Sequence, residues 1–235
     1  MPRVFVSAEQ IPEITGSDVH HIRDVLRLKA GDPLELLDGT GKIYGAKISK
    51  VEKDKIICEI LDSRTPDSEP GTRVTLAQAL PKARKMDFIV EKCVELGVYR
   101  IVPMATERSV AKSAKIDRWE KIAKAAALQS GRSIIPEITG LMTFNEVLKL
   151  RGKYDQALIP WELEKVRSLK KHFTDNRISG SPDILIAIGP EGGFSQKEIE
   201  LAKKAGFASI SLGKRILRTE TAGMAVLSAI MYELE

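Results

Sequence analysis

The chain has 235 residues, of which 43% are hydrophobic and 29% are charged, and its net charge is +5. This balance is typical of a globular protein with a buried core, and no apolar run approaches the ~18 residues of a membrane-spanning helix. The two cysteines, Cys58 and Cys93, provide neither a disulfide framework nor a cysteine zinc site. These features argue against a membrane protein and predict a reducing, cytoplasmic setting.

The basic residues are concentrated near the middle of the chain. Residues 1–70 carry ten Lys or Arg against thirteen Asp or Glu, whereas residues 73–132 carry thirteen against six. Such a block can attract a polyanion such as nucleic acid. From the charge alone, a solvated lysine-rich helix face is an equally good interpretation.

Residues 1–68 are typical of a small β-rich domain. Short apolar runs predict strands at 4–6, 34–37, 43–48 and 56–61, with a hairpin turn at 38–41. One helix is expected over 19–28, with Ser17 as its N-cap. The prolines and glycine of 62–71 predict a linker. We therefore expect a small β-barrel followed by a second domain over 72–235.

In the second domain, predicted strands and helices alternate, as in α/β layer structures. The strands are expected at 74–80, 100–103, 183–188 and 208–212. Gly97 ends a helix predicted over 86–96. Asp117 and Ser195 each begin a sequence typical of a capping box, and Thr219 is the expected start of the last helix.

A glycine-rich loop follows the apolar strand at 183–188. Its sequence is Gly-Pro-Glu-Gly-Gly-Phe, and ligands of open α/β sheets bind outside the carboxyl ends of the strands. The loop is neither a dinucleotide fingerprint nor a phosphate loop, and Glu191 would repel a phosphate. It favours a ligand with hydroxyls, amines or positive charge, although glycine-rich turns without a ligand are common.

A second, basic loop follows the strand at 208–212. Arg218 and Glu220 flank Thr219 there, so an acidic and a basic loop at one sheet edge could frame a pocket. The alternative is that Thr219 only caps a helix and that Arg218 is a surface residue.

These two motifs, IGPEGGF and LGKRILRTETA, together resemble the signature of the 16S ribosomal RNA uracil-N3 methyltransferases, the RsmE family of the SPOUT superfamily. Further residues fall in family-like order, so the resemblance covers nearly the whole chain. They include His20, His21, Arg27, Gly31, Asp32, Leu80, Pro81, Lys82, Lys85, Glu95, Pro103, Arg108, Ser109, Trp119, Gln129, Arg132 and Pro136.

The resemblance implies an α/β fold in which a small PUA-like β-barrel precedes a SPOUT α/β domain with a C-terminal trefoil knot, and it implies a homodimer. The implied activity is S-adenosylmethionine-dependent methylation of a uridine N3 in 16S rRNA of the small ribosomal subunit. The cofactor-binding residues carried over from the family are Gly189, Glu191, Gly192, Leu212, Ile216, Leu217 and Arg218.

Methyl transfer needs an aligned uracil N3 and the loss of its imide proton. Arg132 and Arg218 are candidates for stabilising the anion or gripping phosphate, and Glu220 is a candidate base. A structural role of Glu220 in the first helical turn is an equally good interpretation. The RNA-binding candidates are Arg3, Arg23, Arg27, Lys82, Lys85 and Arg108. No histidine–carboxylate spacing supports a metal, so none is expected.

Two other function classes compete with this interpretation. One is a non-catalytic RNA-binding ribosome assembly factor with a degenerate pocket. The other is a nucleotide-dependent enzyme such as a dehydrogenase, which the missing G-x-G-x-x-G disfavours. Free 16S rRNA and the assembled small subunit remain alternative substrates.

Overall fold

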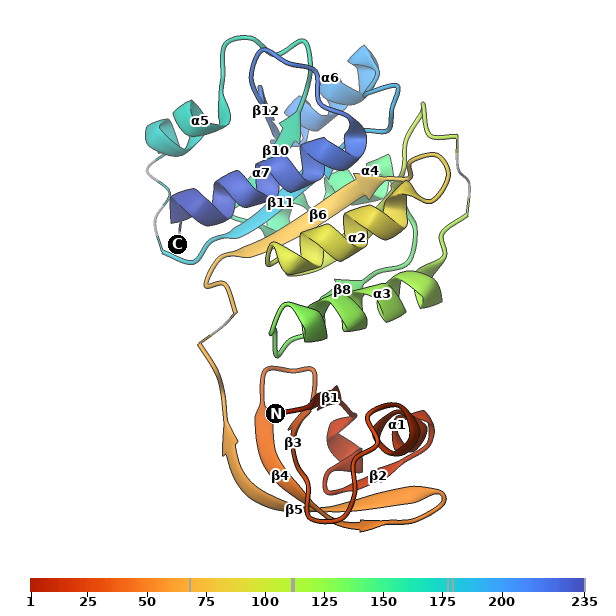
Figure 1. Cartoon of the computed structure of the whole chain (residues 1–235). Helices are drawn as coiled ribbons and strands as arrows, with labels where there is room; N and C mark the ends of the chain where they lie inside the picture. The colour runs from red at the N-terminus through yellow and green to blue at the C-terminus, as the bar shows by residue number, and fades with distance from the viewer. Residues whose placement is uncertain (68, 111–112, 177, 179, 235) are drawn as a thin grey trace. The chain divides into compact units, whose positions relative to one another are not determined.

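The computed structural model describes residues 1–67, 69–110, 113–176, 178 and 180–234. The chain forms two compact units, Met1–Glu69 with Ala127–Ile135 and Pro70–Ala126 with Pro136–Glu235 (Figure 1). The chain first passes from one unit to the other between Glu69 and Pro70, inside the predicted linker. The return of Ala127–Ile135 to the first unit differs from the sequence interpretation, which assigned everything after residue 72 to the second domain. None of the helices described combines the length and apolarity needed to cross a membrane.

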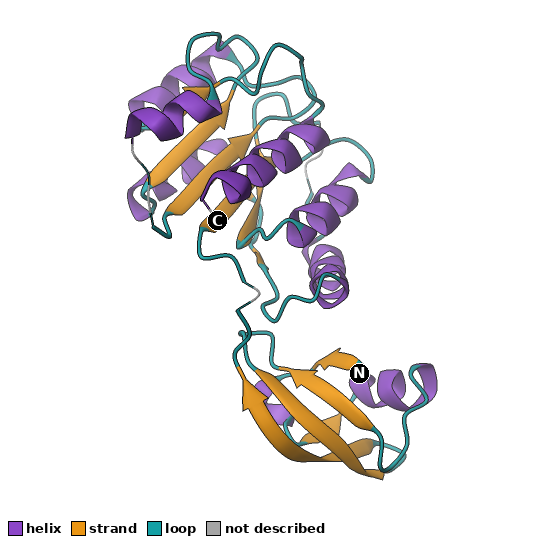
Figure 2. Ribbon diagram, turned by 60° about the vertical axis from the view of Figure 1, so that its left-hand side comes forward, coloured by secondary structure: helices purple, strands orange, loops and turns teal. Residues whose placement is uncertain are grey.

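The first unit is built on a curled five-stranded sheet with the order β1-β3-β4-β5-β2 (Figure 2). β1 pairs in parallel with β3, and the other pairs are antiparallel. Alternate side chains such as Leu34, Leu36 and Ile48 point into one apolar core. This half-barrel is the small β-domain that the sequence predicts. The strands are β1 Arg3–Phe5, β2 Glu13–Thr15, β3 Pro33–Leu37, β4 Ile43–Val51 and β5 Lys55–Arg64.

The predicted helix over 19–28 is replaced by shorter pieces. α1 spans Ser17–His20 and continues as a π-helical turn, η2, over His21–Val25. Gly16, with φ +71°, is the N-cap, so the assignment of that role to Ser17 is wrong. A short 3-10 turn, η1, spans Ala8–Gln10.

The hairpin turn between β3 and β4 is confirmed. The Asp38 carboxylate accepts hydrogen bonds from the N–H groups of Thr40 and Lys42 at 2.8 and 3.2 Å. β5, however, continues to Arg64, so the linker begins later than residue 62. β2 was not predicted, because its sequence Glu-Ile-Thr contains a single apolar residue.

The second unit contains a parallel sheet with the order β12-β10-β11-β6-β7-β8, and β9 pairs beside β7. Every pairing in this sheet is parallel, as expected for alternating strands and helices. The strands are β6 Arg73–Ala79, β7 Arg100–Ala105, β8 Glu137–Ile138, β9 Met142–Thr143, β10 Gln156–Pro160, β11 Asp183–Ile188 and β12 Ala208–Ile210.

Helices cover both faces of this sheet. α2 packs against α7, and α7 lies on β6 and β11 (Figure 1). On the opposite face, Phe144 of α4 and Ile199 of α6 share a core with Ala77 and Leu185 of the sheet. The helices are α2 Lys85–Glu95, α3 Ile116–Gln129, α4 Phe144–Lys149, α5 Leu169–Asn176, α6 Gln196–Lys204 and α7 Thr219–Leu234, with a 3-10 turn, η3, at Leu150–Lys153.

The predicted helix boundaries of this unit are confirmed at three places and wrong at one. Ser195 caps α6 in a capping box with Glu198, and Gly97 follows the end of α2 with φ +90°. α7 begins at Thr219. Asp117 is not an N-cap, because α3 already begins at Ile116.

Candidate active site

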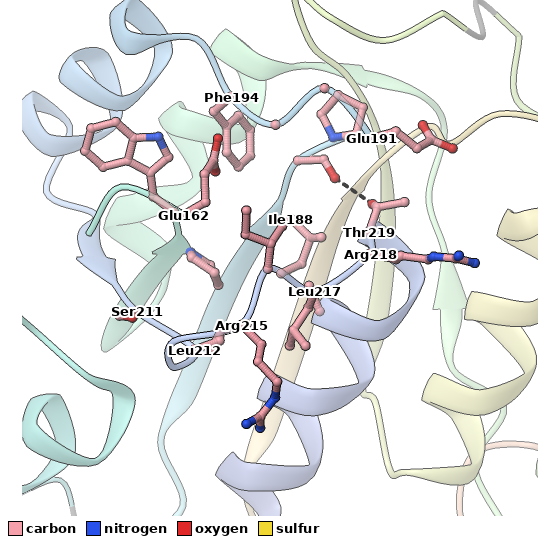
Figure 3. Close-up of a pocket in the computed structure, with 18 of the residues that line it drawn as sticks. Glu162, Ile188, Glu191, Phe194, Ser211, Leu212, Arg215, Leu217, Arg218 and Thr219 are labelled. Atoms are coloured by element: carbon pink, nitrogen blue, oxygen red, sulfur yellow. Dashed lines mark hydrogen bonds between the residues drawn. The ribbon is translucent and has the colours of Figure 1, made fainter. Parts of the chain in front are cut away.

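Three loops meet at one edge of the sheet of the second unit. They follow β10, β11 and β12, and because these neighbouring strands run parallel, their carboxyl ends point to the same edge. Residues 161–162, 189–194 and 211–218 of these loops line a cavity of about 420 Å³ (Figure 3). Cavities of this volume are typical of small-molecule sites.

The loop after β11 is a tight turn fixed from two sides. Gly193 has φ +64°, a conformation that favours glycine, and its N–H donates to the Pro190 carbonyl at 2.9 Å. From the outer side, Arg108 Nη1 donates to the Gly192 carbonyl at 2.7 Å. The backbone of this loop therefore has a defined conformation in which it can meet a ligand.

The loop after β12 presents both apolar and cationic side chains to the cavity. Leu212, Ile216 and Leu217 line it, and Ile216 is 85% exposed. Gly213, with φ +111°, turns the chain away from the strand. An exposed isoleucine at the rim of a cavity offers apolar surface that a planar ring could cover.

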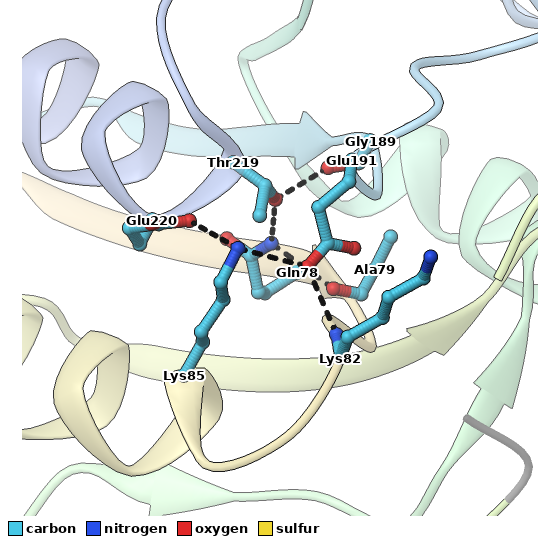
Figure 4. A network of polar contacts seen from close by, with 8 residues as sticks. All are labelled: Gln78, Ala79, Lys82, Lys85, Gly189, Glu191, Thr219 and Glu220. Atoms are coloured by element: carbon cyan, nitrogen blue, oxygen red, sulfur yellow. Dashed lines mark hydrogen bonds and ion pairs between the residues drawn. The ribbon is translucent and has the colours of Figure 1, made fainter. Parts of the chain in front are cut away.

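A buried glutamine connects these two loops (Figure 4). Gln78, which has 0% exposure in β6, donates from Nε2 to Thr219 Oγ1 at 2.9 Å. The Thr219 hydroxyl in turn donates to the Gly189 carbonyl at 2.6 Å. Thr219 therefore begins α7, as predicted, but its hydroxyl holds the glycine loop rather than serving only the helix.

The Glu191 carboxylate is directed away from the other side chains of the cavity (Figure 3). Its Oε1 accepts hydrogen bonds from the Lys82 N–H and from Lys85 Nζ, both at 3.0 Å. Burial acts to raise the pKa of Glu191, but the hydrogen bonds outweigh it and hold this pKa below its ordinary value. Lys85 Nζ also lies 3.4 Å from Glu220 Oε2. Glu191 is thus a partner of Lys85 more than a free charge for a ligand.

The third loop supplies a carboxylate that the sequence analysis missed. Glu162 follows Trp161 after β10 and lines the cavity beside Gly193. The signal for it is weak: the apolar residues of β10 form a run of only four before Trp-Glu. Interpreting that run as one more buried parallel strand would have placed Glu162 at the same sheet edge as the two recognised motifs.

All seven residues predicted to bind the cofactor line this one cavity. They are Gly189, Glu191, Gly192, Leu212, Ile216, Leu217 and Arg218. Arg218, also a catalytic candidate, has a side chain that extends away from the other lining residues (Figure 3). Glu220 lies in the first turn of α7 and pairs with Lys85.

Arg132, the third catalytic candidate, lies in the first unit. Its Nη2 is 2.7 Å from Glu69 Oε2, and its side chain is only 6% exposed. The same Glu69 carboxylate accepts hydrogen bonds from the backbone N–H groups of Ser133 and Ile134 at 2.8 and 3.0 Å. This cluster explains why Ala127–Ile135 packs with the first unit.

Two of the three RNA-binding candidates in the second unit have partners within the chain. Lys85 pairs with Glu191, and Arg108 donates to the Gly192 carbonyl. Lys82 contributes its backbone N–H to Glu191, while its side chain is exposed.

Of the three RNA-binding candidates in the first unit, two likewise have partners within the chain and one is exposed. Arg3 pairs with Glu35 at 2.9 Å, and Arg23 pairs with Asp24 at 2.8 Å. Arg27 is exposed and has φ +57°.

Comparison with known proteins identifies the family to which the chain belongs. An RNA methyltransferase PUA domain model matches residues 14–61, and an RNA methyltransferase domain model matches residues 68–231. A ribosomal RNA small subunit methyltransferase E from Bacillus subtilis is 33% identical over 250 residues, which cover 100% of this chain and 98% of that relative. The chain belongs to the ribosomal RNA small subunit methyltransferase E family.

Solved members and relatives of the methyltransferase E family share the fold. The crystal structure of a methyltransferase E from Neisseria gonorrhoeae bound to S-adenosylmethionine has a TM-score of 0.87 and 33% identity, covering 100% of this chain and 98% of that one. A Legionella pneumophila methyltransferase in complex with the same cofactor has a TM-score of 0.87 and 32% identity, covering 98% and 97%. The predicted family, the PUA-like first domain and the α/β second domain are thereby confirmed.

Proposed function

We propose that this chain transfers the methyl group of S-adenosylmethionine to the N3 of a uridine in 16S rRNA of the small ribosomal subunit. Methyltransferase E relatives over the full chain length support the enzyme class and the small-subunit rRNA. Two relatives solved with S-adenosylmethionine support the cofactor. The expected enzyme class and cofactor are thereby confirmed at the level of the family. The N3 position rests on the sequence motifs alone.

The cavity has the chemistry that this cofactor requires. Leu212, Ile216 and Leu217 offer apolar contact to the adenine, and the glycine loop offers backbone groups to polar parts of the ligand. The loop over 189–194 has no lysine to bind a phosphate, and S-adenosylmethionine carries none. Glu162 places a negative charge in the cavity, which suits a cationic ligand.

The protein contributes mainly placement and charge to the reaction. The bound cofactor would supply an electrophilic methyl group on a sulfonium. The chain must hold the uracil so that N3 lies about 3–3.5 Å from the methyl carbon. Arg218, exposed beside the cavity, would stabilise the negative charge that develops on the uracil as N3 loses its proton.

Glu220 would accept the N3 proton. Lys85 Nζ lies 3.4 Å from Glu220 Oε2, so this carboxylate has a cationic neighbour at the start of α7. Its position in the first turn of α7, directly after Thr219, places it close to the loop that carries Arg218. Glu220 and Arg218 are therefore the proposed catalytic pair.

Arg132 stays a predicted phosphate contact rather than a group at the reacting base. Its guanidinium donates to Glu69 Oε2 from Nε and Nη2 at 3.0 and 2.7 Å, so an RNA phosphate would have to replace that carboxylate. Lys82, Arg27 and the other basic candidates remain proposed RNA contacts that act through phosphates.

We also propose that the protein is a cytoplasmic homodimer, and that the loops after β11 and β12 take part in a trefoil knot. Phe88 on α2 is 46% exposed and Tyr232 on α7 is 90% exposed. Because α2 and α7 pack side by side, their exposed apolar groups can be covered by one partner surface. Light scattering at micromolar concentration should give twice the mass of one chain, and the mass of a single chain would contradict the dimer.

The observation that carries the proposed function is the meeting of three loops in one cavity in a chain of this family. The experiment supplies S-adenosylmethionine with either deproteinised 16S rRNA or small subunits from cells lacking the enzyme. N3 methylation blocks the pairing edge of uracil, so reverse transcription should stop one nucleotide before the modified position. Cofactor binding without methylation of either substrate would favour the non-catalytic assembly factor instead.

A further inference from the structure

The two carboxylates that line the cavity differ in their surroundings. Glu191 is hydrogen-bonded to the Lys82 N–H and Lys85 Nζ, as described above. By contrast, within the described part of the chain, no hydrogen bond or ion pair reaches the Glu162 carboxylate. Glu162 is therefore the lining carboxylate whose charge is available to a ligand.

Glu162 lies close to the glycine loop. A Cβ on Gly193 would lie 2.8 Å from Glu162 Oε1, and Gly193 already has φ +64°. A side chain at this position would therefore push the carboxylate away. Figure 3 shows Glu162 beside Phe194, at the side of the cavity formed by the loops after β10 and β11.

Two cationic side chains line the same cavity. Lys214 and Arg215 line it from the loop after β12, and both are exposed. In the described part of the chain neither forms an ion pair with a carboxylate. A cavity with one free carboxylate and two free cations is complementary to a zwitterion, which carries an ammonium and a carboxylate on one carbon.

We propose that Glu162 binds the α-ammonium of the methionine part of the cofactor. This inference rests on the proposed function, since it assigns one end of S-adenosylmethionine. The exposed position of Glu162 suits an ammonium, which keeps part of its hydration at a rim. The sulfonium, in contrast, must present its methyl group to the base, and ribose hydroxyls need no charge.

The test compares S-adenosylmethionine with two neutral-sulfur ligands, of which only one keeps the amino acid. S-adenosylhomocysteine keeps the α-ammonium but lacks the sulfonium, and 5′-methylthioadenosine lacks the whole amino acid. Glu162→Gln removes the charge but preserves the size of the side chain. Binding is measured by calorimetry, and by the fluorescence of Trp161 in a Trp119→Phe background, because Trp161 lines the cavity and Trp119 is buried elsewhere.

Glu162→Gln should weaken S-adenosylmethionine and S-adenosylhomocysteine equally, by about tenfold, which corresponds to one charge-assisted hydrogen bond. The affinity for 5′-methylthioadenosine should not change. The loss should shrink as salt is raised, since the carboxylate is exposed. Glu200→Gln on α6 removes the same charge outside the cavity and should leave all three affinities unchanged.

Three outcomes would overturn the inference. Unchanged binding of all ligands would remove Glu162 from the site. A loss for S-adenosylmethionine alone would assign Glu162 to the sulfonium, and an equal loss for 5′-methylthioadenosine would assign it to the ribose. Failure of the unmodified protein to bind S-adenosylmethionine at all would instead contradict the proposed function.

Discussion

The Thr219 hydroxyl donates a 2.6 Å hydrogen bond to the Gly189 carbonyl, and this bond joins the start of α7 to the loop after β11. The two residues are thirty positions apart in the chain. Gln78 Nε2 donates a hydrogen bond to the oxygen of the same hydroxyl, so the hydroxyl proton is directed at the Gly189 carbonyl (Figure 4). One side-chain hydroxyl thus links two of the segments that line the candidate cofactor cavity.

Thr219→Val should loosen this cavity. The substitution preserves the shape of the side chain but leaves the Gly189 carbonyl without its donor, and Gln78 Nε2 keeps only the Ala79 carbonyl as an acceptor; this costs about 1–3 kcal/mol of unfolding free energy. We expect weaker binding of S-adenosylmethionine by calorimetry and a lower urea midpoint. Thr221→Val, at an exposed position of the same helix, is the control and should change neither. Equal cofactor affinity in the two variants would contradict the role of Thr219.

Substitutions of Arg108 and Lys82 should differ in their effect on cofactor binding, while both lower RNA affinity. Arg108 Nη1 donates to the Gly192 carbonyl, whereas the Lys82 side chain is exposed. Lys82→Gln should lower RNA affinity and reduce the salt slope by about 0.7–0.9, with cofactor affinity unchanged. Arg108→Gln should in addition weaken the cofactor about fivefold, because the outer support of the glycine loop is lost. Parallel titrations of both variants check this, and identical behaviour of the two would argue against the distinction.

Substitutions of Glu69 and of Arg132 should lower the free energy of unfolding by different amounts. Glu69 accepts hydrogen bonds from the Arg132 guanidinium and from two backbone N–H groups, so Glu69→Ala removes one acceptor shared by these donors and should cost about 1–3 kcal/mol of unfolding free energy. Arg132→Met leaves Glu69 with its two backbone donors and should cost less. Urea unfolding of both single variants and the double variant measures the difference. A larger loss for Arg132→Met would contradict this interpretation.

His172 should make the stability depend on pH. Burial first, and then the nearby Arg167, lower its pKa below the ordinary 6.5, while Asp175 acts in the opposite direction. The unfolded state therefore binds the proton more readily than the folded state, so the unfolding free energy should fall as pH drops below about 6.5. Its full contribution is present above that pH.

The measurement compares urea midpoints between pH 7.5 and 5.5 in the unmodified chain and in His172→Gln. The chain has only two other histidines, His20 and His21, so this variant should have a flatter profile. A profile of equal slope in both proteins would assign the pH dependence to other groups.

The sequence predicted two of the three cavity loops because each carries a recognisable motif. Gly193 and Gly213 both adopt positive φ, and glycine at such positions is visible in a sequence. Glu162 has no such neighbour on its own loop. Its role depends on the pairing of β10 between β11 and β12, which strand order alone determines and no local pattern reveals.

The partners of charged residues were the least predictable feature. Arg132 stands in a family-like motif, but its partner Glu69 lies 63 positions away. Glu191 was expected to repel a phosphate, and the structure pairs its carboxylate with Lys85, 106 positions away. Ion pairs of this kind follow from the tertiary fold, so sequence periodicity carries no information about them. The prediction of one helix over 19–28 was wrong for a local reason. A π-helical turn and an α-helix share nearly the same apolar pattern.

The packing of Ala127–Ile135 with the first unit means that the backbone passes from one unit to the other three times, after Glu69, after Ala126 and after Ile135. Neither unit is a single stretch of polypeptide. A protein cut in the linker would leave a strip of the first unit attached to the downstream fragment, and separate expression of residues 72–235 would carry Arg132 without Glu69. An exchange of the RNA-binding unit between relatives consequently requires two segments to be transplanted together.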